Sequence, residues 1–342
     1  MNQQTKLTPA DFASDQEVRW CPGCGDYAIL KALYKTLAEI EARPENTVVI
    51  SGIGCAARLP YYMNTYGFHT IHGRAPPIAT GTKLTNPELD VWIITGDGDS
   101  MSIGGNHMLH VLRRDIDVQI LLFNNEIYGL TKGQASPTSR TGTRSPTTPG
   151  GSVDQPVAPC VFALGAGARY VARSGDILQK HLPDMMARAH AHKGASFVEI
   201  LQNCHIYNDH VFEAETSKKT TADHTVLLEH GAPMIFGAAR DKGLRLNTTK
   251  LTLEVVTIGA DGVTEADLMI HDETNITLAN MLARLQGPEF PVAMGVLYNA
   301  GEGPAHAALP QWDEAERTSH KAMIADIEKV LTQGASFVKR EG

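Results

Sequence analysis

The sequence has little that would take it into a membrane or onto nucleic acid. No apolar run in its 342 residues approaches the ~18 residues of a membrane-spanning helix, and the N-terminal stretch lacks the basic-then-apolar pattern of a signal peptide. Positive charge is not in excess, because 30 Lys and Arg residues face 38 Asp and Glu residues and leave a net charge of −8. These absences predict a cytoplasmic globular protein that binds neither nucleic acid nor membrane.

Cysteine is also scarce, and there are too few cysteines to suggest a disulfide framework. A CxxC pair can be half of a zinc site, a redox pair or half of an iron–sulfur site. No second CxxC is present, which argues against a zinc ribbon, and the surrounding pattern does not suit a thioredoxin-like dithiol. The five cysteines are Cys21 and Cys24 in WCPGCG, Cys55 in SGIGCAARLP, Cys204 in LQNCHIYN, and Cys160, whose apolar neighbours predict a buried structural residue.

Short apolar runs alternate with helical patterns along the first part of the chain. The runs at 47–52, 91–96 and 117–125 predict buried strands, and residues 25–41 and 106–114 predict amphipathic helices. Strands that alternate with helices in this way form a parallel sheet with helical crossovers. The sequence therefore predicts an α/β fold with a doubly wound parallel sheet.

The remainder of the chain divides into three parts. Residues 131–159 are rich in Gly, Pro, Ser and Thr and predict one long loop. A strand at 168–173, a helix at 175–192 and a strand at 196–201 are expected next. Beyond about residue 222 the pattern changes, so we predict a domain over 1–222 and a C-terminal extension over 223–342. The extension is expected to end in a helix at 314–333 and to pack on a partner subunit or a second copy.

A GDG turn and an Asn-Asn pair follow two of the predicted strands. Gly96 and Gly98 allow the backbone to approach a ligand closely, and Asp97 offers a carboxylate. Asn125 follows one strand–helix–strand unit later, and ligands of parallel sheets bind beyond the carboxyl ends of strands. Because Mg²⁺ prefers oxygen donors, the pair predicts a magnesium–diphosphate site. The alternative is a turn aspartate and a capping asparagine without ligands.

These segments resemble the thiamine-diphosphate motif, in which GDG is followed one strand later by NN. Together with SGIGCAARLP, HTIHGRAPPIATGTKL and YGLTKGQASPTS, they are similar to the beta subunit of 2-oxoacid:ferredoxin oxidoreductases, most of all the 2-oxoglutarate type. The resemblance covers about residues 18–222 and implies a thiamine-diphosphate-binding fold. It implies that Asp97, Asn125 and the carbonyl of Ile127 hold Mg²⁺, and that Cys21, Cys24, Cys55 and Cys204 bind one 4Fe–4S cluster.

The resemblance also implies a set of residues around the cofactor and the substrate. His72 is expected at the thiamine site, and Arg58 at the position that recognises the 2-oxoacid, where its guanidinium would suit a second substrate carboxylate. Leu130 and Lys132 match positions that line the substrate pocket, although Lys132 could equally be a solvated loop residue. The remaining cofactor contacts implied are Ile53, Gly54, Cys55, Ala56, Gly96, Gly98, Asp99 and Gly129.

The implied activity is coenzyme A-dependent oxidative decarboxylation of 2-oxoglutarate to succinyl-coenzyme A, with electron transfer to ferredoxin. No Glu stands in a motif that would activate thiamine, so we expect the chain to work only with an alpha subunit, as a heterotetramer. Pyruvate or a broader range of 2-oxoacids is the alternative substrate class. A non-redox thiamine carboligase and a non-catalytic electron-transfer subunit are less favoured, because the cysteines and the GDG–NN pair occur together.

Overall fold

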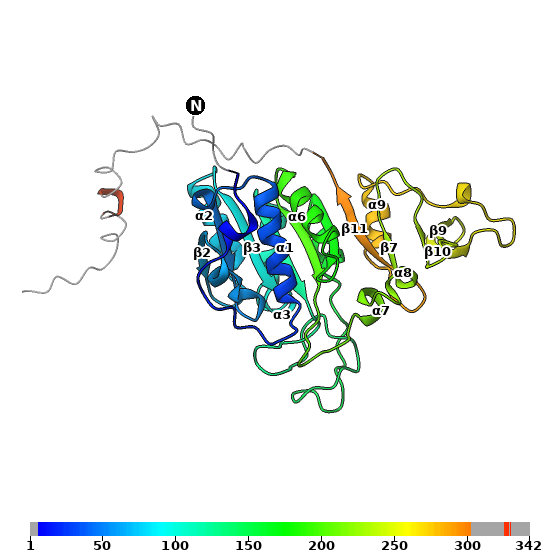
Figure 1. Ribbon diagram of the computed structural model, residues 1–342, viewed down its shortest axis with the longest axis horizontal. Coiled ribbons are helices and arrows are strands. Elements are labelled where there is room, and N and C mark those ends of the chain that lie inside the picture. The colour runs from blue at the N-terminus through cyan, green and yellow to red at the C-terminus, as the bar shows by residue number, and fades with distance from the viewer. Residues whose placement is uncertain (1–5, 302–324, 328, 330–342) are drawn as a thin grey trace, which may run out of the picture. The chain divides into compact units, whose positions relative to one another are not determined.

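The computed structural model describes residues 6–301, 325–327 and 329 (Figure 1). Its main sheet has eight strands in the order β2-β1-β3-β4-β6-β5-β11-β7. Strands β2, β1, β3, β4, β6 and β5 are mutually parallel, whereas β11 runs antiparallel to β5 and pairs in parallel with β7. The bounds are β1 Thr47–Ser51, β2 Tyr66–His69, β3 Asp90–Gly96, β4 Gln119–Asn124, β5 Tyr170–Gly175, β6 Ser196–Leu201, β7 Thr225–Leu227 and β11 Val292–Asn299.

Helices cover both faces of this sheet, as a doubly wound fold requires. Strand β3 shows why: Val91 and Ile93 pack in the core on one face, and Trp92 and Ile94 pack in the core on the other, with the period of two that strands impose. Helices α1 (Asp26–Glu39) and α6 (His181–Ala191) cover the second of these faces (Figure 1). The first is covered by α2 (Ala75–Thr85), α4 (Gly105–Arg113), α5 (Pro159–Gly165) and α9 (Ile276–Leu282).

The C-terminal part contributes to the same core. Its strands β7 and β11 complete the main sheet, and a separate antiparallel sheet is formed by β8 (Ile235–Phe236), β9 (Lys242–Asn247) and β10 (Thr252–Thr257). The compact unit containing the sheet runs from Met1 to Pro304, and a second unit is Ala305–Gly342. A boundary at residue 222 therefore does not separate two compact units, because two strands beyond it pair within the main sheet. Packing of the extension on a partner remains a prediction.

Most sequence-predicted elements are present. The predicted helix at 175–192 begins only at His181, because Asp176 accepts a hydrogen bond from the backbone N–H of Asn203 and holds a turn there. Three short helices also occur: α3 (Asp97–Ser100), α7 (Glu213–Thr216) and α8 (Thr221–His224). The predicted terminal helix at 314–333 lies outside the described residues except for 325–327 and 329, which are helical.

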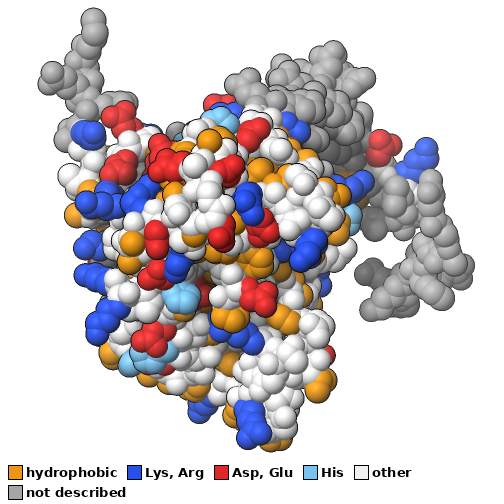
Figure 2. All heavy atoms as spheres, turned by 90° about the vertical axis from the view of Figure 1, so that its right-hand side faces the viewer, with side chains coloured by type: hydrophobic (Ala, Val, Ile, Leu, Met, Phe, Trp, Pro, Cys, Tyr) orange, Lys and Arg blue, Asp and Glu red, His pale blue; other side chains and the backbone are white. Residues whose placement is uncertain are grey.

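The surface shows no segregation of charge on the face that Figure 2 presents, where Lys and Arg side chains are interspersed with Asp and Glu. Among the described residues, none of the helices combines the length and the apolar character needed to traverse a bilayer.

Candidate functional site

The segments predicted to bind the cofactor and the cluster follow four adjacent strands and lie at one edge of the sheet. Strands β1, β3, β4 and β6 are neighbours and parallel, so their carboxyl ends lie side by side. The segments that follow them carry Cys55, Asp97, Asn125 and Cys204, respectively. This is the edge at which ligands of open α/β sheets bind. Residues far apart in the sequence are thereby brought together by strand order alone.

Asp97 is the first residue of α3 and is almost completely buried. Its Oδ2 accepts a hydrogen bond of 2.6 Å from the Thr138 hydroxyl, which also lies 3.1 Å from Oδ1 of Asn124. Burial raises the pKa of Asp97, although hydrogen bonds from Ser136 and Thr138 oppose the shift. No basic side chain of the described residues forms an ion pair with it. A buried carboxylate without a cationic partner is costly, and a divalent ion would supply the missing charge.

Asn125 and Ile127 lie in the turn that follows β4. The side-chain Oδ1 of Asn125 accepts the backbone N–H of Ile127 at 3.1 Å, and Glu126 between them has a left-handed φ of 55°. Asn208, four residues beyond Cys204, donates to the carbonyl of Asn125 at 2.9 Å. The turn that would supply two magnesium ligands is thus tied to the segment that carries a cysteine.

Asp99 is a structural anchor for the two loops that flank the GDG turn. Its carboxylate accepts the backbone N–H of Ile53 at 3.1 Å, the backbone N–H of Gly73 at 2.7 Å and the hydroxyl of Thr95 at 2.8 Å. It also lies 2.6 Å from Nδ1 of His72. The resemblance implies a cofactor contact for Asp99, which stays a prediction, and its carboxylate has four partners within the protein.

The glycines of these loops differ in what they make possible. A Cβ on Gly98 would lie 2.2 Å from the ring of Tyr128, whose hydroxyl donates to the Gly98 carbonyl at 2.9 Å. Glycine at this position therefore admits a protein side chain, not only a ligand. Gly54, with φ of 131° and no described atom within 4 Å of its Cβ position, leaves open space beside Cys55.

The four cysteines of the predicted cluster come from three segments that meet at the same edge. The sulfurs of Cys204 and Cys55 lie 3.4 and 3.8 Å from the Cβ position of Gly129, so their separation cannot exceed the sum of those distances. The backbone N–H of Cys24 donates to the carbonyl of Cys21 at 3.1 Å, and the next residue, Gly25, donates to the carbonyl of Asn203 at 3.2 Å.

Burial disfavours ionisation of the Cys24, Cys55 and Cys204 thiols in the protein alone. Burial raises the pKa of Cys24 well above its usual range, with smaller contributions from Asp26, Cys55 and Cys204, and burial raises the pKa of Cys55 to about 12. Burial also raises the pKa of Cys204. Positive charge from bound metal deprotonates such thiols. This donor set is compatible with an iron–sulfur cluster.

Among the described residues, no group of three His, Cys, Asp or Glu side chains is arranged to hold a single metal ion. A 4Fe–4S cluster does not need such a group, because each cysteine binds a different iron and the sulfurs surround the cluster from outside.

The residues predicted to contact substrate lie near these groups but are less constrained. Arg58 lies in the 3-10 helix η3 (Ala56–Tyr62) directly after Cys55, is half-buried and forms no ion pair with any described residue. His72 is partly exposed beside Tyr128, with the two rings in an edge-on arrangement. Leu130 and Lys132 are exposed, and Lys132 has a left-handed φ of 76°.

Sequence reasoning missed a buried ionic network behind the site. Glu199 in β6 accepts hydrogen bonds from Arg173 in β5 and Asn124 in β4, both at 2.8 Å, and from the Cys160 thiol at 3.0 Å. Burial alone would raise the pKa of Glu199, but the Arg173 guanidinium holds it below its usual value. Asn124 also meets Thr138, so the network reaches Asp97. A glutamate within the apolar run SFVEIL was the available signal.

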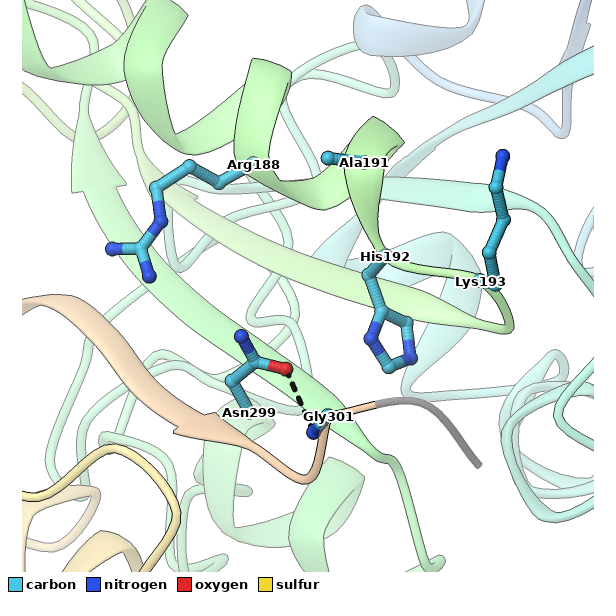
Figure 3. A pocket seen from close by; sticks show the side chains of 6 residues that line it. All are labelled: Arg188, Ala191, His192, Lys193, Asn299 and Gly301. Carbon is cyan, nitrogen blue, oxygen red and sulfur yellow. Dashed lines mark hydrogen bonds between the residues drawn. The ribbon is translucent and has the colours of Figure 1, made fainter. Parts of the chain in front are cut away.

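A pocket of about 240 Å³ lies elsewhere, lined by the end of α6, the residues after it and the end of β11 (Figure 3). Lys193 precedes the start of β6, and Asn299 pairs with Tyr170 at the start of β5. The pocket is therefore at the amino edge of the parallel strands, opposite the GDG turn and the cysteines.

Comparisons with known proteins agree with the predicted fold and resemblance. The family model described as "Thiamine pyrophosphate enzyme, C-terminal TPP binding domain" matches residues 52–200. The chain is 46% identical over 314 residues to "2-oxoglutarate oxidoreductase subunit KorB" of Mycobacterium tuberculosis, covering 90% of this chain and 80% of that protein. It is 45% identical to "2-oxoacid:ferredoxin oxidoreductase 1, subunit beta" of Aeropyrum pernix, covering 61% of this chain and 65% of that protein.

A solved structure gives the same result. The chain superimposes with a TM-score of 0.70 and 30% identity on "2-oxoglutarate:ferredoxin oxidoreductase from Magnetococcus marinus with 2-oxoglutarate, coenzyme A and succinyl-CoA bound". The alignment covers 98% of this chain and 94% of that one. These matches confirm the predicted resemblance and the α/β fold.

Proposed function

The chain belongs to the beta-subunit family of the 2-oxoacid:ferredoxin oxidoreductases, and we propose that the carboxyl edge of its sheet binds thiamine diphosphate beside an iron–sulfur cluster. The activity is oxidation of 2-oxoglutarate and coenzyme A to succinyl-coenzyme A and carbon dioxide. Two electrons and one proton are released, and two ferredoxins accept the electrons. The observation that carries the proposal is the convergence of Cys55, Asp97, Asn125 and Cys204 at four adjacent strand ends.

In this proposal Asp97, Asn125 and the Ile127 carbonyl hold Mg²⁺, which binds the diphosphate. The buried Asp97 carboxylate supplies the charge, and the Asn125–Ile127 hydrogen bond fixes the turn. Bound thiamine diphosphate supplies an electron sink for decarboxylation. His72, oriented by Asp99, faces the same edge. We expect an alpha subunit to complete the site, because thiamine activation needs a carboxylate and no glutamate of the sequence stands in a motif that would supply it.

The cluster would be held by Cys21, Cys24, Cys55 and Cys204. Cys55 and Cys204 both approach Gly129, which follows the magnesium-binding turn by two residues. The electron acceptor therefore lies close to the place where electrons are released, and ferredoxin would accept them from the cluster. Cys21 is exposed and provides the outermost ligand of the set.

We expect Arg58→Ala to reduce kcat/KM for 2-oxoglutarate about ten- to a hundredfold while affecting pyruvate far less. The second carboxylate of 2-oxoglutarate needs a cationic partner, and a hydrogen bond to a charged group contributes roughly 1.5–3 kcal/mol. Arg58 forms no ion pair with described residues and is thus free to provide it. Steady-state kinetics of the anaerobic alpha–beta complex measure both substrates. Arg114→Ala is the control, because Arg114 is exposed between the end of α4 and the start of β4, at the opposite edge of the sheet. Equal losses for both substrates would assign Arg58 to general architecture.

We expect Thr138→Val to weaken thiamine-diphosphate binding and to lower the free energy of unfolding. The change removes the hydroxyl that donates to Asp97 and Asn124, and losing a hydrogen bond to a buried charged group costs about 1.5–3 kcal/mol. Partners of metal ligands typically contribute 10–100-fold in affinity. Calorimetric titration and urea unfolding measure the two effects. Thr138→Ser should restore both, and a Ser variant as impaired as Val would show that packing rather than the hydroxyl is responsible.

The activity itself is tested with the chain co-purified with its alpha subunit under anaerobic conditions. Reduction of ferredoxin should depend on coenzyme A and be faster with 2-oxoglutarate than with pyruvate. A preference for pyruvate would transfer the assignment to the alternative substrate class. Carboligation without ferredoxin reduction would overturn the redox assignment.

A further inference from the structure

Gln202 connects the end of β6 to the CPGCG segment. The residue is 1% exposed, and its Nε2 lies 3.3 Å from Sγ of Cys24 and 2.8 Å from the carbonyl oxygen of Asn203. Among the described residues, no other side-chain amide donates a hydrogen bond to a cysteine sulfur. The sulfur that it reaches lies far away in the sequence.

The orientation of this amide is fixed by its surroundings. Rotating the amide by half a turn would place Oε1 against the Asn203 carbonyl oxygen, and two acceptors repel. In the observed orientation Oε1 is buried and has no hydrogen-bond partner. Burying an unsatisfied acceptor costs about 1–3 kcal/mol, and such groups in a native protein call for an explanation. The orientation that leaves Oε1 of Gln202 without a partner is the one in which Nε2 donates to the sulfur of Cys24.

Gly25 makes this approach possible. A Cβ on Gly25 would lie 3.1 Å from Cγ of Gln202 and 1.9 Å from a carboxylate oxygen of Asp176. Only glycine after Cys24 therefore allows the start of α1 to close against the end of β6. The glycine of CPGCG, the glutamine and the cysteine form one packed arrangement.

We propose that Gln202 raises the reduction potential of the iron–sulfur cluster by hydrogen bonding to the sulfur of Cys24. This inference rests on the proposed cluster. One-electron reduction adds negative charge to the cluster and its sulfurs, so an N–H donor stabilises the reduced form more than the oxidised form. Hydrogen bonds to the sulfurs are a known determinant of such potentials. The cluster would thereby become a better acceptor for electrons released at the neighbouring cofactor site.

Other groups around the sulfurs act differently and do not replace Gln202. The backbone N–H of Asp26 also faces the sulfur of Cys24 and is unaffected by side-chain substitution, whereas the Asp26 carboxyl would oppose reduction when it is charged. Trp20 Nε1 donates to the carbonyl of Cys55 at 2.7 Å, not to its sulfur. Backbone N–H groups of residues 206–208 face the sulfur of Cys204 and are unaffected by side-chain substitution. Gln202 is therefore a positioned donor whose effect can be isolated by mutation.

The test is a potentiometric titration of the anaerobic alpha–beta complex, followed by electron paramagnetic resonance, after iron and sulfide have been measured. Gln202→Leu preserves size and removes the donor. At a fixed potential it should lower the ratio of reduced to oxidised cluster about three- to tenfold. This corresponds to a potential about 28–59 mV more negative, at 59 mV per tenfold for one electron.

Gln119→Leu is a matched control, because Gln119 is also buried and has an unpartnered Oε1 but lies at the start of β4, at the opposite edge. Its potential should equal that of the wild type. If Gln202→Leu loses iron, Gln202→Glu keeps the shape without the donor and should also lower the potential. An unchanged potential with full iron content overturns the role of Gln202 alone. Absence of iron from the wild-type complex overturns the proposed cluster, and this inference with it.

Discussion

Replacing Asp97 by Ala should severely weaken thiamine-diphosphate binding while leaving the iron content unchanged. Asp97 offers the only carboxylate among the three proposed magnesium ligands, and it is buried at the first turn of α3. Even partners of metal ligands contribute about 10–100-fold in affinity, so loss of the charged ligand should weaken binding by more than about a hundredfold. Isothermal titration with Mg²⁺ and thiamine diphosphate measures the affinity.

Two companion variants make this result specific. Asp97→Asn keeps the shape and the Thr138 contact but removes the charge, so it should be almost as defective as Asp97→Ala. Asp154→Ala removes an exposed carboxylate from the 131–159 loop and should bind the cofactor normally. Wild-type affinity in both Asp97 variants would show that the buried carboxylate serves only to stabilise the turn.

Replacing Cys24 by Ala should remove most of the iron from the chain. The wild type should contain about four irons per chain, the stoichiometry of one 4Fe–4S cluster, and loss of a thiolate ligand prevents stable assembly. Cys24 is the partly buried member of the CxxC pair and lies within reach of the charges of Cys55 and Cys204. Iron and acid-labile sulfide analysis of anaerobically purified protein gives the answer.

Cys160→Ser is the control for this measurement. Cys160 is buried behind the site and donates to Glu199, and serine preserves that donor. Its iron content should equal that of the wild type. Stoichiometric zinc without iron in the wild-type protein, or iron that depends on Cys160, would refute the ligand set.

The sequence was sufficient to predict those elements that are marked by a run of neighbouring residues. The runs at 47–52, 91–96 and 196–201 match β1, β3 and β6, because buried parallel strands are continuous apolar segments. The GDG and NN turns follow strands that prove to be neighbours. The cysteine register required the family resemblance, since spacing alone left zinc, redox and cluster sites open.

The sequence was insufficient where the structure depends on contacts between distant segments. The edge strand β2 is exposed along its whole length, so it carries no apolar run that would reveal it. Strand β11 follows the separate sheet of β8, β9 and β10 in the chain, and no local sequence pattern identifies β5 and β7 as its partners. The roles of Asp99 and Gln202 arise from side chains that reach other loops, and neither spacing nor composition encodes such contacts.

We propose that one chain holds both the thiamine-diphosphate site, where electrons are released, and the iron–sulfur cluster that accepts them. Anaerobic absorbance spectroscopy of the alpha–beta complex tests this proposal most directly. With thiamine diphosphate, Mg²⁺ and coenzyme A present but no ferredoxin, adding 2-oxoglutarate should bleach the visible absorbance of the cluster. The Asp97→Ala complex should not respond to 2-oxoglutarate, although dithionite should still bleach it. A wild-type complex that contains both iron and thiamine diphosphate but shows no bleaching with 2-oxoglutarate or any other 2-oxoacid would contradict the assignment.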